Sequence, residues 1–324
     1  MSPLYPEIEP HAEGMLAVGD GNSLYWEVSG NPDGRPVVAL HGGPGSGSSP
    51  RVRRFFDPGV YRIILFDQRG CGRSRPHAST AGCDLSVNTT RHLVEDLERL
   101  RRHLGVERWF LFGHSWGTTL ALTYAQAERE RVLGLVLVGV TTTRRSEIDW
   151  LYRGLARFFP EDWARFRAGV AADARDGDLI EAYYRLVNDP DPAVCAKAAR
   201  DWHDWEAASM KVDPAAKPPA RWSDPGYLLA RTRIITHYFH HNAWLEEGAL
   251  LRGAAQLGGI PAALVQGRLD LEAPPVTAWE LSRVWPDAEL HMVASAGHSH
   301  ADPGLGETVI SVTDRFAAEV PVQS

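Results

Sequence analysis

Cysteine is scarce in this chain, and long apolar runs and clustered basic residues are missing from it. The three cysteines, Cys71, Cys83 and Cys195, are odd in number and widely spaced, which excludes the CxxC pairs of zinc sites and a disulfide-stapled secreted fold. No apolar run reaches the roughly 18 residues that a membrane span needs, and the opening residues lack the basic flank and apolar stretch of a signal peptide. We therefore expect a cytoplasmic protein with no membrane partner.

The formal net charge of -7 is spread along the chain. Nucleic-acid binding requires a clustered basic surface, and the nearest approach to one, Arg51, Arg53 and Arg54, is expected to be a solvated face. We therefore expect no nucleic-acid partner, and a small molecule or a short peptide as the substrate. Composition leaves the oligomeric state open.

Short apolar runs of strand length recur along the chain, and each ends at a glycine, aspartate or histidine turn. Amphipathic helical patterns separate several of them, as over residues 90–104. This alternation predicts an α/β fold, a mostly parallel central sheet flanked by helices, whose sites lie at the carboxyl ends of the strands. The runs are Pro36 to Leu40, Arg62 to Phe66, Trp109 to Phe112, Val132 to Val138, Ala262 to Val265 and Leu290 to Val293.

The alternation stops in the middle of the chain and is replaced by helical patterning with many prolines. A chain of 324 residues exceeds the length at which a single core usually stops growing, so an insertion is expected. We predict a helical cap at residues 142–257, inserted between the first part of the core, 1–141, and the second part, 258–324. Prolines should divide the cap into short helices.

The pentapeptide Gly113-His114-Ser115-Trp116-Gly117 joins a predicted strand to a stretch of helical character. This is the GxSxG nucleophile elbow, a strained turn that needs glycine at both ends because side chains there would collide with neighbouring backbone. Ser115 is therefore the predicted nucleophile of a serine hydrolase with the α/β-hydrolase fold.

A serine nucleophile needs a histidine base that is held by a carboxylate, in the chain order serine, acid, histidine. Asp270 follows the strand that resumes the core, and His298 follows the next strand, in a loop where Gly297 allows a tight turn. Glu272 is an alternative acid and His300 an alternative base. We expect Asp270 and His298 to complete the triad.

Acyl transfer also requires donors for the developing oxyanion. We expect the backbone amides of Trp116, directly after the nucleophile, and of Gly43, in the loop His41-Gly42-Gly43-Pro44-Gly45, to supply them. The run from Asp67 to Ser74 is expected to buttress this loop. No cofactor and no metal are predicted, since His237, His240 and His241 share a helical face but have no further ligand in the sequence.

Motifs along nearly the whole chain resemble those of the proline iminopeptidases (prolyl aminopeptidases), serine peptidases of this fold that release N-terminal proline. The resemblance implies a cap whose acidic groups hold the substrate's amine while aromatic residues enclose the proline ring; it points to Glu206, Trp205 and Tyr238 as substrate-binding residues. The motifs include Leu4-Tyr5-Pro6, the HGGPG loop from His41, DQRGCGRS from Asp67, Ser115-Trp116-Gly117, Trp202 to Glu206 and His237-Tyr238-Phe239.

The sequence departs from the family pattern where specificity is set. The resemblance implies a second amine-binding glutamate two residues before His237, where this chain has Ile235, and a glycine where it has His114. It also implies an Arg-Gly-Ile motif at residues 138–140. The leading hypothesis is therefore release of an N-terminal proline or similar residue through an acyl-enzyme. The alternatives are an amidase, esterase or thioesterase acting on a non-peptide molecule, and a non-catalytic binding homologue.

Overall fold

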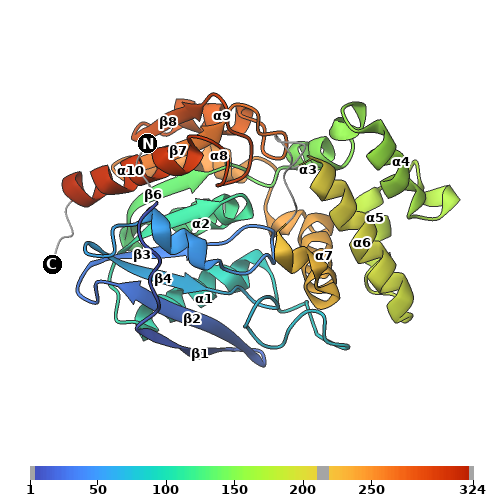
Figure 1. Ribbon diagram of the computed structural model, residues 1–324, viewed down its shortest axis with the longest axis horizontal. Helices are drawn as coiled ribbons and strands as arrows, with labels where there is room; N and C mark the ends of the chain where they lie inside the picture. The colour runs from blue at the N-terminus through green and yellow to red at the C-terminus, as the bar shows by residue number, and fades with distance from the viewer. Residues whose placement is uncertain (1–3, 210–218, 321–324) are drawn as a thin grey trace.

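The computed structural model describes residues 4–209 and 219–320. At the centre of this part lies an eight-stranded sheet with the strand order β1-β2-β4-β3-β5-β6-β7-β8 (Figure 1). β2 is antiparallel to β1 and to β4, and all other neighbours are parallel. The expected mostly parallel sheet is confirmed. The strands are β1 Ala12–Gly19, β2 Asn22–Gly30, β3 Arg35–Leu40, β4 Tyr61–Phe66, β5 Trp109–His114, β6 Val132–Val138, β7 Ala262–Gly267 and β8 Ala288–Val293.

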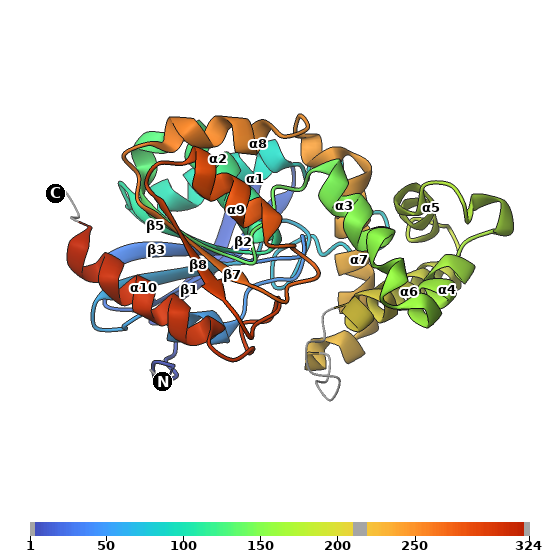
Figure 2. The ribbon, with the colours of Figure 1, turned by 90° about the horizontal axis from the view of Figure 1, so that it is seen from above.

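Helices cover both faces of the sheet, which is why the central strands are mostly apolar. α1 (Thr90–His103), α2 (Trp116–Ala127) and α9 (Val276–Val284) lie on one face, and α10 (Leu305–Glu319) lies on the other (Figure 2). Successive side chains of a strand point to opposite faces. Accordingly, Leu111 of β5 joins the apolar core under α1 and α2, and Phe112 joins the core under α10.

The hairpin of β1 and β2 was not among the predicted strands. β1 lies at the edge of the sheet, and its side chains alternate between exposed and partly buried. The apolar runs that predict buried central strands are therefore missing from it. The turn that joins the two strands contains Gly19, Asp20 and Gly21, all with positive φ.

A helical segment lies between β6 and β7, beyond the carboxyl ends of the strands (Figure 2). Its helices are α3 Arg145–Tyr152, α4 Pro160–Ala168, α5 Leu179–Leu186, α6 Pro192–Ser209 and α7 Pro225–His240. Three of them begin at a proline. The first residues of a helix have no intrahelical acceptor for their N–H groups, so a proline there costs no hydrogen bond.

The last helix before β7, α8 (Ala249–Gly253), lies apart from α3–α7. Gln126 of α2 donates a hydrogen bond through Nε2 to the carbonyl of Leu250, at 2.8 Å, so α8 packs beside α2 on the core. The division of the chain at residues 142 and 257 stays a prediction. None of the helices in the described ranges combines the length and apolarity needed to cross a membrane.

Candidate active site

Ser115 occupies a strained turn between β5 and α2, with φ 55° and ψ -126°. Its amide donates to the carbonyl of Val138, at 3.0 Å, which ties the turn to β6. A Cβ on Gly117 would lie 2.0 Å from the Leu40 carbonyl oxygen, and a Cβ on Gly113 would lie 2.5 Å from that of Gly117. Glycine is therefore required at both ends of the turn, as the sequence motif predicts.

Asp270 follows β7 and is buried, with every oxygen lone pair directed at a donor. Its Oδ2 accepts hydrogen bonds from His298 Nδ1 at 2.8 Å and from Gln266 Nε2 at 3.0 Å. Its Oδ1 accepts the backbone amides of Glu272 at 3.0 Å and Ala273 at 2.8 Å. The carboxylate is thus fixed, and a proton on His298 Nδ1 leaves Nε2 of the same ring as the nitrogen able to accept one.

The loop that carries His298 is supported by His114, one of the departures from the family pattern. His114 is buried, and this burial lowers its pKa to about 3. The neutral ring donates from Nε2 to the His298 carbonyl at 2.9 Å, and its centroid lies 3.8 Å from that of His300. The ring of His300 packs against Phe55 and Phe112, so this histidine belongs to the support of the loop.

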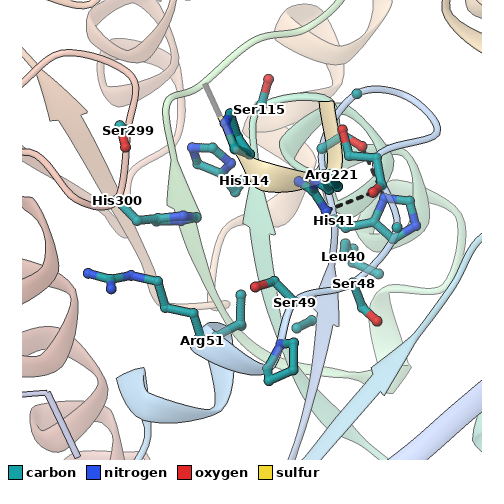
Figure 3. Close-up of a pocket in the computed structure, with 18 of the residues that line it drawn as sticks. Leu40, His41, Ser48, Ser49, Arg51, His114, Ser115, Arg221, Ser299 and His300 are labelled. Carbon is teal, nitrogen blue, oxygen red and sulfur yellow. Dashed lines mark hydrogen bonds between the residues drawn. The ribbon is translucent and has the colours of Figure 1, made fainter. Parts of the chain in front are cut away.

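Two adjoining cavities meet at Ser115. The larger has a volume of about 620 Å³ and the smaller about 60 Å³, and five residues line both: Gly43, Ser115, Arg231, Glu272 and His298. Figure 3 shows side chains of the larger cavity converging from the loop after β3, the end of β5 and the loop after β8. These are the carboxyl ends of parallel strands, where the fold is expected to place its site.

Ser115 and His298 share the cavity, but no hydrogen bond joins them among the described residues. His298 Nε2 lies instead 3.4 Å from Glu272 Oε2. Asp270 therefore bonds Nδ1, the nitrogen that the orienting acid of a triad bonds. Glu272, the alternative acid, faces Nε2, the nitrogen that must accept the serine proton. Catalytic hydrogen bonds are often long before substrate binds, so this geometry fits an unliganded triad.

The two predicted oxyanion donors lie on the wall of the smaller cavity. Gly43 and Trp116 line it together with Ser115. Gly43 has a φ of 115°, and a Cβ there would lie 2.6 Å from the amide nitrogen of Gly45. Gln68 links the loop of Gly43 to the side chain of Trp116, since its Nε2 donates to the His41 carbonyl at 3.0 Å and its Oε1 accepts from the Trp116 indole at 3.0 Å. The run from Asp67 therefore does buttress the loop.

Glu206 lines the smaller cavity, but its carboxylate is already engaged. Its Oε1 accepts from Tyr152 Oη and Trp202 Nε1, each at 2.9 Å, and Arg231 donates to its Oε2. Burial alone would raise the pKa of Glu206, yet the Arg231 guanidinium holds it below its usual value. Arg231 was not predicted as a site residue, because in the sequence it is one of two arginines in the stretch that forms α7 and nothing there marks it as the buried partner of Glu206.

The two aromatic residues expected to bind substrate lie outside the linings of both cavities. The indole of Trp205 donates to the Leu151 carbonyl at 3.2 Å and packs against Trp163 among the cap helices. The hydroxyl of Tyr238 donates to Asn88 Oδ1 at 2.9 Å. Each residue therefore contributes to packing in this structure, and the expectation that they enclose a proline ring does not match their positions.

Two of the three histidines at the end of α7, His240 and His241, use a ring nitrogen in a separate contact. His240 Nδ1 pairs with Glu181 at 2.6 Å, and His241 Nδ1 bonds the His237 carbonyl at 2.8 Å. Within residues 4–209 and 219–320, His, Cys, Asp and Glu side chains form no group of three that could hold a metal ion.

Comparison with known proteins shows the family to which the chain belongs. Residues 35–302 match the family described as alpha/beta hydrolase fold, and the chain belongs to it. Its relatives include a probable proline iminopeptidase of Streptomyces coelicolor, 51% identical over 97% of this chain and 98% of the relative. Another is a proline iminopeptidase of Xylella fastidiosa, 45% identical over 98% of this chain and 100% of the relative. Within the fold, the chain belongs to the proline iminopeptidase family, whose members are serine hydrolases.

Solved structures show the same fold at lower identity. The proline iminopeptidase of Mycobacterium smegmatis is 21% identical with a TM-score of 0.62, covering 95% of this chain and 98% of that one. The structure of VinJ is also 21% identical with a TM-score of 0.65, covering 97% of this chain and 100% of that one. At these identities the likeness concerns the fold alone.

Proposed function

We propose that this protein is a proline iminopeptidase that hydrolyses the bond after an N-terminal proline, or a similar residue, in short peptides or amides. The observation that carries the proposal is the 51% identity, over nearly the full length of both chains, with a probable proline iminopeptidase. The Ser115 elbow and the Asp270–His298 pair support the chemistry. The larger cavity, about 620 Å³, is of the size that takes a small ligand.

In the proposed reaction, Ser115 Oγ attacks the carbonyl carbon of the first residue while His298 Nε2 takes the hydroxyl proton. The amides of Gly43 and Trp116 donate to the resulting oxyanion. When the scissile bond breaks, His298 returns the proton to the leaving amine, and the acyl group remains as an ester on Ser115. Water, activated by the same histidine, then hydrolyses the ester and releases the free amino acid. Asp270 holds the imidazole throughout.

Proline p-nitroanilide tests the proposed function. We expect release of nitroaniline with saturation kinetics by the wild-type protein and none above background by a Ser115→Ala variant. If the wild type cleaves short acyl esters but not the prolyl amide, the protein is a hydrolase of another specificity.

The second candidate is hydrolysis of a non-peptide amide, ester or thioester. The pairing of Glu206 with Arg231 favours it, because the ion pair removes free negative charge from a cavity in which a charged amine would bind. A panel of aminoacyl and simple acyl amides separates the two. The peptidase hypothesis predicts the highest kcat/KM for substrates with a free amine, and the second candidate predicts no such preference.

The acid limb of the pH profile of kcat/KM should lie at a higher pH than that of an ordinary histidine. Burial lowers the pKa of His298, but the carboxylates of Asp270 and Glu272 outweigh it and raise the pKa to about 9. Other titratable or charged groups nearby are Asp302 and the buried His300 on the same loop, His114 at the end of β5, whose ring centroid lies 4.9 Å from that of His298, and Arg231, which faces Glu272 from α7. Only the neutral imidazole can act as a base, so kcat/KM for a neutral ester should rise with pH, reach half its maximum near pH 9 and level off above that pH. A limb at or below the ordinary histidine value of about 6.5 would contradict this.

We further propose a cytoplasmic location, which the free thiols of Cys71, Cys83 and Cys195 support.

A further inference from the structure

Glu272 is a carboxylate of the active-site cavity that the proposed mechanism does not use. It lines both cavities together with Ser115 and His298, and 15% of its side chain is exposed. Its Oε1 accepts a long hydrogen bond from Ser209 Oγ at 3.5 Å, and its Oε2 lies 3.4 Å from His298 Nε2. Among the described residues, neither arginine nor lysine forms an ion pair with it. A charge so placed is available to a ligand.

The other carboxylates of the cavity wall are neutralised. Glu206 pairs with Arg231 and accepts two further hydrogen bonds, so an ammonium group brought to it would also meet the guanidinium. Glu147 pairs with Arg144 and accepts from Thr141 and Thr277. Glu272 is therefore the lining carboxylate, within the described chain, that is left to bind a cation.

We propose that Glu272, rather than Glu206, binds the protonated N-terminal amine of the substrate and thereby restricts cleavage to the bond after the first residue. The proposal rests on the peptidase function proposed above, for which it names the residue that selects the substrate.

The position of Glu272 fits an amine next to the scissile carbonyl. In the reacting complex, His298 Nε2 lies about 3 Å from Ser115 Oγ, and the carbonyl carbon lies about 3 Å from the same oxygen. The amine of the first residue lies only about 2.5 Å from that carbon, since they are separated by Cα alone. A carboxylate 3.4 Å from Nε2 is therefore within reach of this amine. A residue inside a peptide offers a neutral amide there, and the preceding chain would have to occupy the space that Glu272 fills.

The charge interaction between Glu272 and His298 explains how binding of the substrate amine would affect catalysis. Burial raises the pKa of Glu272 to about 7, and an ammonium partner would favour its charged form. When the carboxylate turns to the amine, its hold on His298 Nε2 weakens, and that nitrogen becomes free to accept the hydroxyl proton of Ser115. Binding of the correct substrate thus removes the Glu272–His298 contact that competes with Ser115 for His298 Nε2.

Two esters that differ in a single ring atom test the proposal. Proline benzyl ester carries the amine, and benzyl cyclopentanecarboxylate has carbon in its place. We expect the wild-type ratio of their kcat/KM values to favour the amine, and Glu272→Gln to reduce this ratio by about 10- to 150-fold, the value of a charge-assisted hydrogen bond of 1.5 to 3 kcal/mol. Glu246→Gln, a control at an 81% exposed side chain, should leave the ratio unchanged. A ratio of rates measured on one sample does not depend on the fraction that is folded.

The proposal is overturned if the wild type shows no preference for the amine, or if Glu272→Gln lowers both rates equally, because Glu272 would then act through His298. Glu206→Gln abolishing the preference while Glu272→Gln retains it would also overturn it. These outcomes are distinct from failure of the proposed function, because that failure would appear as an absence of prolyl amide cleavage. Since esters react more readily than amides, the ester ratio measures amine recognition in either case.

Discussion

Replacing Ser115 with alanine is expected to lower kcat for prolyl amides by about 10³- to 10⁶-fold while changing KM little. The reason is that the hydroxyl forms the acyl-enzyme, whereas the cavity wall, formed largely by other residues, still binds substrate. Steady-state kinetics on proline p-nitroanilide measures the effect.

Ser282→Ala is a matched control, because its hydroxyl is exposed on α9 and donates to the Trp279 carbonyl of the same helix at 2.7 Å. It should retain wild-type kinetics. If Ser115→Ala keeps more than about a tenth of the wild-type kcat, a loss of less than about 1.4 kcal/mol in barrier stabilisation, Ser115 is not the nucleophile.

Asp270→Asn is expected to lower kcat by about 10⁴-fold. An asparagine amide facing Nδ1 would force the proton of His298 onto Nε2, so that the ring could no longer accept one from Ser115. The backbone amides of Glu272 and Ala273 that bond Oδ1 would hold the new side chain in nearly the same place, so the fold should persist. Kinetics together with thermal unfolding distinguishes this loss of activity from loss of structure.

The comparison with Glu272→Gln decides between the two candidate acids. If Asp270 orients His298, its replacement has the larger effect on a neutral ester. The reverse order would assign the orienting role to Glu272. Asp33→Asn, in an exposed loop before β3, should match the wild type.

Much of the fold could be predicted because the parallel strands are buried on both faces. The run Val132 to Val138 is apolar at every position except Gly134 and forms β6 over the same bounds. β1 escaped prediction because an edge strand with one solvated face carries no such run, and β2 escaped it because polar residues such as the buried Glu27 interrupt its apolar pattern. Its pairing with β4 depends on contacts between distant segments, which local pattern does not encode.

The positions of Ser115, Asp270 and His298 could be anticipated because each follows a strand, and parallel strands end at one edge of the sheet. The substrate-binding residues were harder to predict, since they belong to helices. Which side of a helix faces the cavity depends on tertiary packing. Trp205 and Tyr238 turn into the protein interior, and the charge of Glu206 is taken by Arg231, a partner 25 residues away. Glu272 was considered only as an acid for the triad because its distance from His298 Nε2 follows from the loop geometry and not from spacing.

Covalent trapping with a proline-derived diphenyl phosphonate tests most directly whether Ser115 is the nucleophile of a proline-releasing peptidase. We expect a single adduct by intact-protein mass, located by peptide mapping on Ser115, absent from Ser115→Ala and formed much more slowly with the cyclopentyl analogue that lacks the ring nitrogen. An adduct on another residue, or no adduct from a protein that cleaves prolyl amides, would contradict the assignment.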